Sequence, residues 1–105
     1  MKVLKYRKEI FDLVKEGKKK VEVRKINKDH IDVNDHVIGI SEDVKEIYGS
    51  VKVTGKWLMN RVSAIRYLRK HGETETLEFL KNNYKDQGLL LVFNIEYYES
   101  PQAGM

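Results

Sequence analysis

Cysteine is absent from this 105-residue chain, so neither a disulfide framework nor a thiolate-bound zinc ion can support the fold. Long apolar runs are absent too, because no stretch approaches the roughly 20 apolar residues that a membrane-spanning helix needs. The first residues carry too many charges to contain the apolar segment of a signal peptide. We therefore expect a soluble protein of the cytoplasm that has no membrane partner.

Familiar catalytic motifs are missing as well. The chain has no Gly-x-Ser-x-Gly nucleophile elbow, no cysteine nucleophile and no glycine-rich loop that would hold a phosphate. One polar loop gathers candidate metal ligands, namely Asp29, His30, Asp32, Asp35 and His36. Their spacing matches no recognised metal-binding pattern, so the sequence predicts no metal site and no cofactor. Whether the protein is an enzyme stays open, and a non-catalytic role is favoured.

Basic residues are concentrated in one segment. Residues 15–28 contain seven basic and two acidic residues and carry a charge of +5, whereas the rest of the chain carries −1. A basic stripe on an otherwise balanced protein indicates an anionic partner, of which nucleic acid is the commonest. A solvated, lysine-rich surface is the ordinary alternative.

The apolar pattern predicts a single domain at residues 1–98, followed by a flexible C-terminal tail at residues 99–105. Strands are predicted at Lys2–Tyr6, Lys19–Ile26, His36–Ser41, Tyr48–Thr54, Lys56–Met59 and Leu89–Tyr97. A first helix is predicted at Arg7–Glu16, and a second is predicted from the apolar stripe formed by Val62, Ile65 and Leu68. A third helix is predicted to begin with a cap at Thr74 or Thr76 and to have Leu77, Leu80 and Tyr84 on its inner face. This order argues against a parallel doubly wound sheet. We expect an α+β fold, with a small, mostly antiparallel β-barrel flanked by two to three helices.

The segment Gly17–Arg24 packs five charged residues into eight positions, where a helix ends and a strand begins. Side chains alternate between the two faces of a strand, so Lys20, Glu22 and Arg24 are expected on one face and the intervening valines on the other. A carboxylate two residues from a guanidinium can orient it by hydrogen bonding and can limit repulsion among the cations. The segment is therefore suited to presenting a fixed arginine to a phosphate or a base edge.

The spacing Gly17-x-Lys19-x-x-Glu22-x-Arg24 resembles the Gly-x-Lys-x-x-Glu-x-Arg signature of the ASCH domain, a family of the PUA-like superfamily. The segment 33–35, Val-Asn-Asp, resembles the Val-Gly-Asp turn of PUA-like domains, with Asn in place of Gly. The resemblance implies a PUA-like barrel with a basic cleft lined by the signature residues, and RNA or a nucleotide-like ligand as the partner.

Several residues are candidate nucleic-acid contacts on these grounds: Lys19, Lys20, Glu22, Arg24, Trp57, Arg66 and Lys70. Arg24 is expected to bind phosphate or a base edge, Lys19 to add charge, and Glu22 to orient Arg24 or accept from the ligand. Trp57 is a candidate stacking platform for an unpaired base, and the basic residues of the second helix are candidate phosphate contacts. A structural ion pair and a solvated helix face are the alternatives.

Enzymatic functions remain open as alternatives to RNA binding. Some ASCH-like proteins are amidohydrolases that remove the acetyl group of acetylated cytidine, and they resemble this chain at Gly17, Lys19 and Arg24. Their threonine nucleophile is replaced here by Glu22, which would have to act as a general base while Lys19 polarises the carbonyl. A ribonuclease is a further alternative, for which no acid–base pair can be assigned. A protein partner in a transcription or translation complex is also compatible with the sequence.

Overall fold

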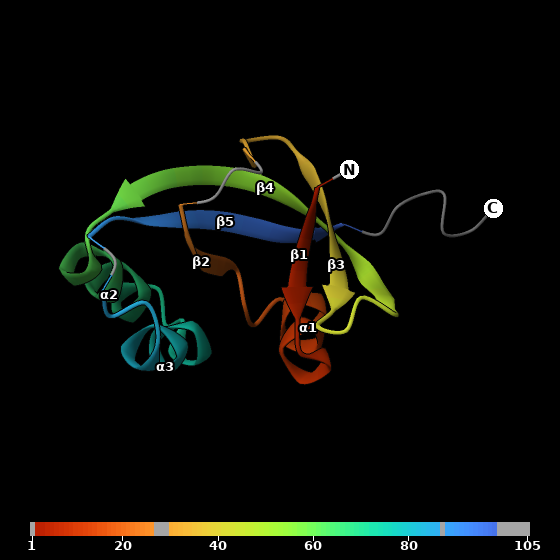
Figure 1. The fold of residues 1–105 in the computed structure, drawn as a ribbon, viewed down its shortest axis with the longest axis horizontal. Coiled ribbons are helices and arrows are strands. Elements are labelled where there is room, and N and C mark those ends of the chain that lie inside the picture. The colour runs from red at the N-terminus through yellow and green to blue at the C-terminus, as the bar shows by residue number, and fades with distance from the viewer. Residues whose placement is uncertain (1, 27–29, 87, 99–105) are drawn as a thin grey trace.

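The computed structural model describes residues 2–26, 30–86 and 88–98, which form one curled sheet with three helices packed against it (Figure 1). The strands are β1 (Val3–Tyr6), β2 (Val21–Lys25), β3 (His36–Ser41), β4 (Ile47–Met59) and β5 (Leu90–Tyr98). The helices are α1 (Lys8–Lys15), α2 (Arg61–Lys70) and α3 (Thr74–Asn82). None of the described helices is long and apolar enough to cross a membrane. The tail predicted at residues 99–105 lies outside the described residues, and the cytoplasmic location stays a prediction.

The sheet has the order β1-β3-β4-β5-β2 and curls into a half-barrel. Among the strands that the structure describes, only β1 and β3 pair in parallel, and the other three pairs are antiparallel. The predicted α+β fold is therefore confirmed. The two strands predicted at Tyr48–Thr54 and Lys56–Met59 are one strand, β4, and Gly55 marks a register irregularity after Val53 within it, in line with the bulge that was one of the two possibilities for Gly55.

Two apolar clusters use alternate residues of β5 and so lie on opposite faces of that strand. The first cluster packs α1 against Leu91, Phe93 and Ile95 of β5. The second packs α2 and α3 against Leu90 and Val92 of the same strand. In Figure 1, α1 lies at the end of the sheet that carries β1 and β3, while α2 and α3 lie together at the other end.

A glycine lies just beyond the end of each of the first two helices, α1 and α2. Gly17 and Gly72 have φ angles of +74° and +68°, in the left-handed region that favours glycine. Each turn has the two hydrogen bonds of a Schellman motif, for example from the Glu73 amide to the Leu68 carbonyl at 2.9 Å and from Gly72 to Arg69 at 3.2 Å. These turns direct the chain from α1 into β2 and from α2 into α3.

The inner faces of α2 and α3 match the prediction in part. The predicted residues Ile65, Leu68, Leu77 and Leu80 all belong to or pack against the second cluster. Val62 is wrong, because it is 59% exposed and Ala64 is buried in the stripe of α2 in its place. Neither threonine caps α3, whose N-cap position is Glu73. Tyr84 packs against the second cluster, but it follows the end of α3 rather than belonging to the helix.

Candidate functional site

A buried carboxylate holds two cations at the start of β2. Glu22 is 1% exposed, and its two oxygens lie 2.7 Å from Lys19 Nζ and 2.6 Å from Arg24 NH1. The described residues supply no further hydrogen-bond donor to these oxygens. We refer to Lys19, Glu22 and Arg24 as the ion triad. It satisfies the charges of three side chains that would otherwise be costly to bury.

Arg24 is fixed by neighbours other than Glu22 as well. Its NH2 donates to the backbone oxygen of Lys5 at 3.2 Å, and its guanidinium lies 5.5 Å from the centre of the Tyr6 ring. Burial lowers the pKa of Arg24, but the Glu22 carboxylate and nearby tyrosines more than offset this, so the pKa is raised overall. Arg24 therefore remains a charged and fixed part of the barrel wall.

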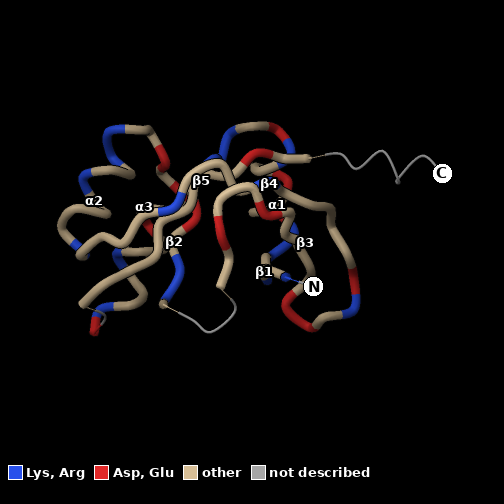
Figure 2. Tube along the Cα trace, turned by 90° about the horizontal axis from the view of Figure 1, so that it is seen from above, with Lys and Arg blue, Asp and Glu red and all other residues tan. Residues whose placement is uncertain are grey.

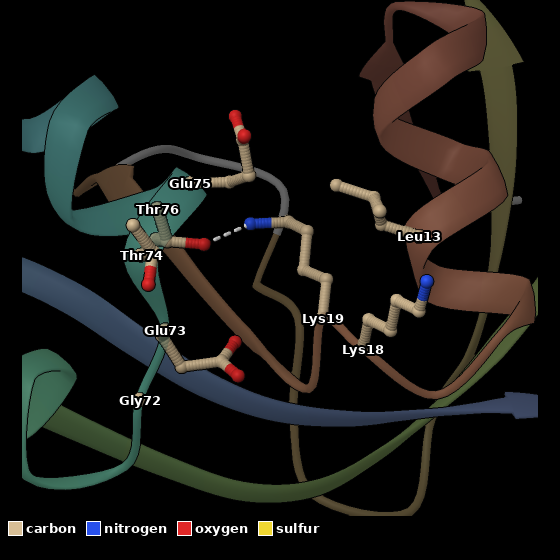
Figure 3. Close-up of a pocket in the computed structure, with 8 residues that line it drawn as sticks. All are labelled: Leu13, Lys18, Lys19, Gly72, Glu73, Thr74, Glu75 and Thr76. Carbon is tan, nitrogen blue, oxygen red and sulfur yellow. Dashed lines mark hydrogen bonds between the residues drawn. The ribbon is translucent and has the colours of Figure 1, made fainter.

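The Lys19 ammonium has three N–H donors, and three acceptors surround it. It donates to the Val21 backbone oxygen at 3.0 Å and to Thr76 Oγ1, and it pairs with Glu22 (Figure 3). The Thr76 hydroxyl donates in turn to the Val21 oxygen at 3.2 Å. A ligand could therefore bind this ammonium only by replacing one of the three acceptors.

Glu73 ties the segment between α2 and α3 to the start of β2. It is 7% exposed, and its Oε1 accepts hydrogen bonds from the backbone amides of Lys20 at 2.9 Å and Val21 at 2.8 Å. The Schellman turn at Gly72 places Glu73 at this point. Both of these bonds go to Oε1, and Glu73 lines two pockets.

Two pockets meet at Glu73. The first has a volume of about 230 Å³ and lies between the end of α1 and the start of α3, with Lys18, Lys19, Thr74 and Thr76 in its wall (Figure 3). It combines ammonium groups, hydroxyls and carboxylates in a small space. Its polar lining suits a polar ligand rather than an apolar one.

The second pocket has a volume of about 350 Å³ and lies on the face of β5 that carries the second apolar cluster. Lys20, Tyr67, His71 and Asn94 line it together with Glu73. The ring centres of Tyr67 and His71 are 4.3 Å apart, and the Tyr67 hydroxyl donates to Asn94 Oδ1 at 2.9 Å. This pocket therefore joins aromatic surface to hydrogen-bonding groups.

The model of the ASCH domain family matches residues 4–99. The chain belongs to the ASCH domain family. ASCH domains are generally thought to bind RNA. The fold is similar to that of the ASCH protein from Zymomonas mobilis, with a TM-score of 0.74 at 14% identity over 92% of this chain and 67% of that chain. It is also similar to a hypothetical protein, PH0355, with a TM-score of 0.67 at 23% identity over 93% of this chain and all of that chain. No curated protein matches the sequence.

The structure brings together only part of the predicted ASCH site. Lys19, rather than Lys20, joins Glu22 and Arg24, because β2 begins at Val21 and the alternation of a strand does not yet apply at Lys20. Lys20 is exposed and lines the second pocket instead. Trp57 lies near that pocket, with its ring centre 5.8 Å from that of Tyr67.

The basic residues predicted to contact phosphate on the second helix, α2, do not belong to the ion triad. Arg66 and Lys70 are exposed on α2, and each is one residue before an aromatic residue of the second pocket. Acidic and basic segments are both distributed over the described trace, and the basic ones are not gathered at one place (Figure 2).

Sequence reasoning considered Thr76 only as a helix cap, left Glu73 as one of three unassigned carboxylates beside Glu75 and Glu78, and gave Asn94 no role. The signal for Asn94 is its place in β5, where it is a polar residue within the otherwise apolar run Leu90–Ile95. The hydrogen bonds of Glu73 and Thr76 link residues more than 50 positions apart, and no local pattern encodes such a contact.

Proposed function

We propose that this ASCH domain binds RNA at the surface around the start of β2. One observation supports the proposal most directly: Lys18 and Lys19 line the first pocket and Lys20 lines the second, so three successive cations border two pockets that meet at Glu73. A polyanion that crosses this boundary meets the exposed ammonium groups of Lys18 and Lys20, one at each pocket.

The lysines of this surface have different roles in the proposed RNA binding. Lys18 and Lys20 are exposed and free to move onto phosphates, and the 3.1 Å pair between Lys18 and Glu16 is a surface pair that a phosphate can replace. The ion triad holds the strand to which they are attached. Glu22 then serves as the group that orients Lys19 and Arg24, rather than as a ligand contact.

The test is a titration of a fluorescently labelled single-stranded oligoribonucleotide at increasing salt. We expect the logarithm of the association constant to fall linearly with the logarithm of the salt concentration. The double variant Lys18→Ala/Lys20→Ala should bind more weakly and show a shallower salt slope, by about one unit for each phosphate that no longer meets a lysine. Lys8→Ala/Lys45→Ala removes the same charge from exposed positions elsewhere and should change little. Absence of binding at low salt, or equally weakened binding in both double variants, would overturn the proposal.

A second candidate function is hydrolysis of acetylated cytidine. Its support is that the Lys19 ammonium, the Thr76 hydroxyl and the Glu73 carboxylate line one pocket of about 230 Å³. Glu22, which replaces the threonine nucleophile of ASCH-like amidohydrolases, is 1% exposed and is held between two cations. Release of cytidine from acetylcytidine that Glu73→Gln abolishes and Glu75→Gln retains would support this activity. No release from the native protein would contradict it.

A further inference from the structure

We propose that the second pocket and the neighbouring Trp57 ring, which contacts Tyr67 of that pocket, together form a stacking and edge-reading site for one unpaired base of a single-stranded RNA. This inference rests on the RNA binding proposed above and adds to it the part of the nucleotide that is recognised. The argument starts from Trp57, the only tryptophan of the chain.

Trp57 is an exposed ring that is nevertheless fixed in place. It is 42% exposed, and its indole lies over Gly55, where an added Cβ would come within 2.5 Å of Cη2 and 2.8 Å of Cζ3. Tyr67 supports it from the side, at 5.8 Å between ring centres. A ring that is held flat loses little conformational freedom when a base stacks on it. Such stacking tolerates any base, because every base has a π face.

Asn94 supplies a hydrogen-bonding edge on the same face of the sheet. It pairs in register with Gly55, directly beside the indole. Because its Oδ1 accepts from the Tyr67 hydroxyl at 2.9 Å, its Nδ2 amide hydrogens are the groups that can donate to a base. Tyr67 is therefore a positioning residue, which fixes both the ring and the amide.

The charges of the pocket determine which part of a nucleotide enters it. The Glu73 and Glu96 carboxylates line the pocket and would repel a phosphate, but they can accept from the amino or imino groups of a base. Lys20 is exposed at the junction with the first pocket, where it can contact the adjacent phosphate. The base therefore enters and the backbone stays outside. A base within a duplex is already stacked on both faces and cannot enter.

The single tryptophan gives the inference a direct measurement. We expect short single-stranded oligoribonucleotides to quench Trp57 fluorescence with the same midpoint as the binding curve from a labelled strand. Inorganic polyphosphate, which carries the charge without bases, should not quench. A hairpin-free RNA duplex of the same length should quench at least about fivefold less at equal occupancy.

Variants separate stacking from charge. Trp57→Ala and Asn94→Ala should each weaken single-strand binding by roughly tenfold while the salt slope stays unchanged. Leu58→Ala is the matched control, because Leu58 is the next residue of β4, is 58% exposed and lies on the opposite face of the strand. Tyr67→Phe keeps the ring but removes the hydroxyl, so it should weaken binding and preserve quenching.

The outcomes distinguish this inference from the proposed function. RNA binding without quenching, together with native affinity in Trp57→Ala and Asn94→Ala, would overturn the base site and leave RNA binding in place. Absence of any RNA binding would overturn both. Weaker binding in Leu58→Ala equal to that in Trp57→Ala would also overturn the base site, because the effect would then not depend on the face of the strand.

Discussion

Glu22 is the residue on which both cations of the ion triad depend. Each of its oxygens faces one cation, and Lys19 is only 7% exposed. A buried pair of this kind adds little stability over an apolar replacement of all its members. Removing one partner is much more costly, because it leaves the opposite charge buried and unpaired.

Glu22→Gln should therefore lower the free energy of unfolding by about 3–5 kcal/mol, as measured by urea denaturation. The matched control is Glu16→Gln, because Glu16 pairs with Lys18 at 3.1 Å on the surface. That change should cost less than about 1 kcal/mol. Equal destabilisation in the two variants would show that burial of the triad does not matter to stability.

Burial of Tyr6 is expected to make the folded protein less stable at alkaline pH. The side chain is 3% exposed, its hydroxyl has no hydrogen-bond partner among the described residues, and burial raises its pKa well above the usual value. The Glu22 carboxylate raises this pKa further, while Arg24 opposes the change. An unfolded tyrosine ionises near pH ~10, but the folded one keeps its proton, so stability falls as the pH rises above that value.

Tyr6→Phe should raise the free energy of unfolding at pH 7 by about 1 kcal/mol, because it removes a buried hydroxyl that has no partner. It should also reduce the loss of stability between about pH 9 and pH 11. Urea denaturation at a series of pH values measures both effects, with Tyr98→Phe as the exposed control. An unchanged alkaline slope in Tyr6→Phe would contradict this assignment.

At the scale of elements, the turn between α2 and α3 sets the position of Glu73. Gly72 has a φ angle of +68°, and the following amide closes the Schellman motif. Glu73 then reaches two amides at the start of β2. A short glycine turn thus joins the helical pair to the strand that carries the basic segment.

Gly72→Ala should lower the free energy of unfolding by about 1–2 kcal/mol, because alanine is strained in the left-handed region. Hydrogen exchange at the amides of Lys20 and Val21 should become faster, because their acceptor is less firmly held. Gly88→Ala is the matched control, since an added Cβ there meets open space and the backbone is not left-handed. Unchanged exchange at both amides would contradict the proposed link.

Helices and strands could be predicted from the sequence where a single local feature determines where they begin or end. Gly17 marks the end of α1 because only the left-handed turn after a helix needs a glycine there. Lys20 was grouped with Glu22 and Arg24 on one face of a strand, but it precedes the first residue of β2 and lines the second pocket, which its sequence neighbours do not encode. Val62 was assigned to the core because its apolarity fits the helical period, although the helix turns Ala64 inward instead.

At the scale of the whole molecule, β5 belongs to both apolar clusters. Its residues alternate between them, and it pairs with both β4 and β2. Weaker packing on one face of this strand therefore weakens the other face as well. We expect one cooperative unfolding transition rather than two.

Leu4→Ala in the first cluster and Leu68→Ala in the second should each lower the free energy of unfolding by about 2–5 kcal/mol. Trp57 fluorescence reports on the side of the second cluster, and far-ultraviolet circular dichroism reports on the whole chain. The two probes should give the same midpoint in each variant. A Trp57 transition that Leu4→Ala leaves unmoved would show that the two halves unfold independently.

The family and the fold class were predictable because the signature Gly17-x-Lys19-x-x-Glu22-x-Arg24 and the order of elements are both local in sequence. The pockets were not, because their walls come from segments that only the folded sheet and helices bring together. Glu73 reaches β2 across 52 residues, and Tyr67 reaches Asn94 across 27.

The pairing of β2 has a consequence for how the chain is made. Its only partner in the described sheet is β5, from Leu90 onward, although β2 itself ends at Lys25. A ribosome therefore releases β2 and the lysines that precede it long before the partner strand exists. During that interval the nascent polypeptide carries this basic segment without the strand that pairs with it in the folded sheet.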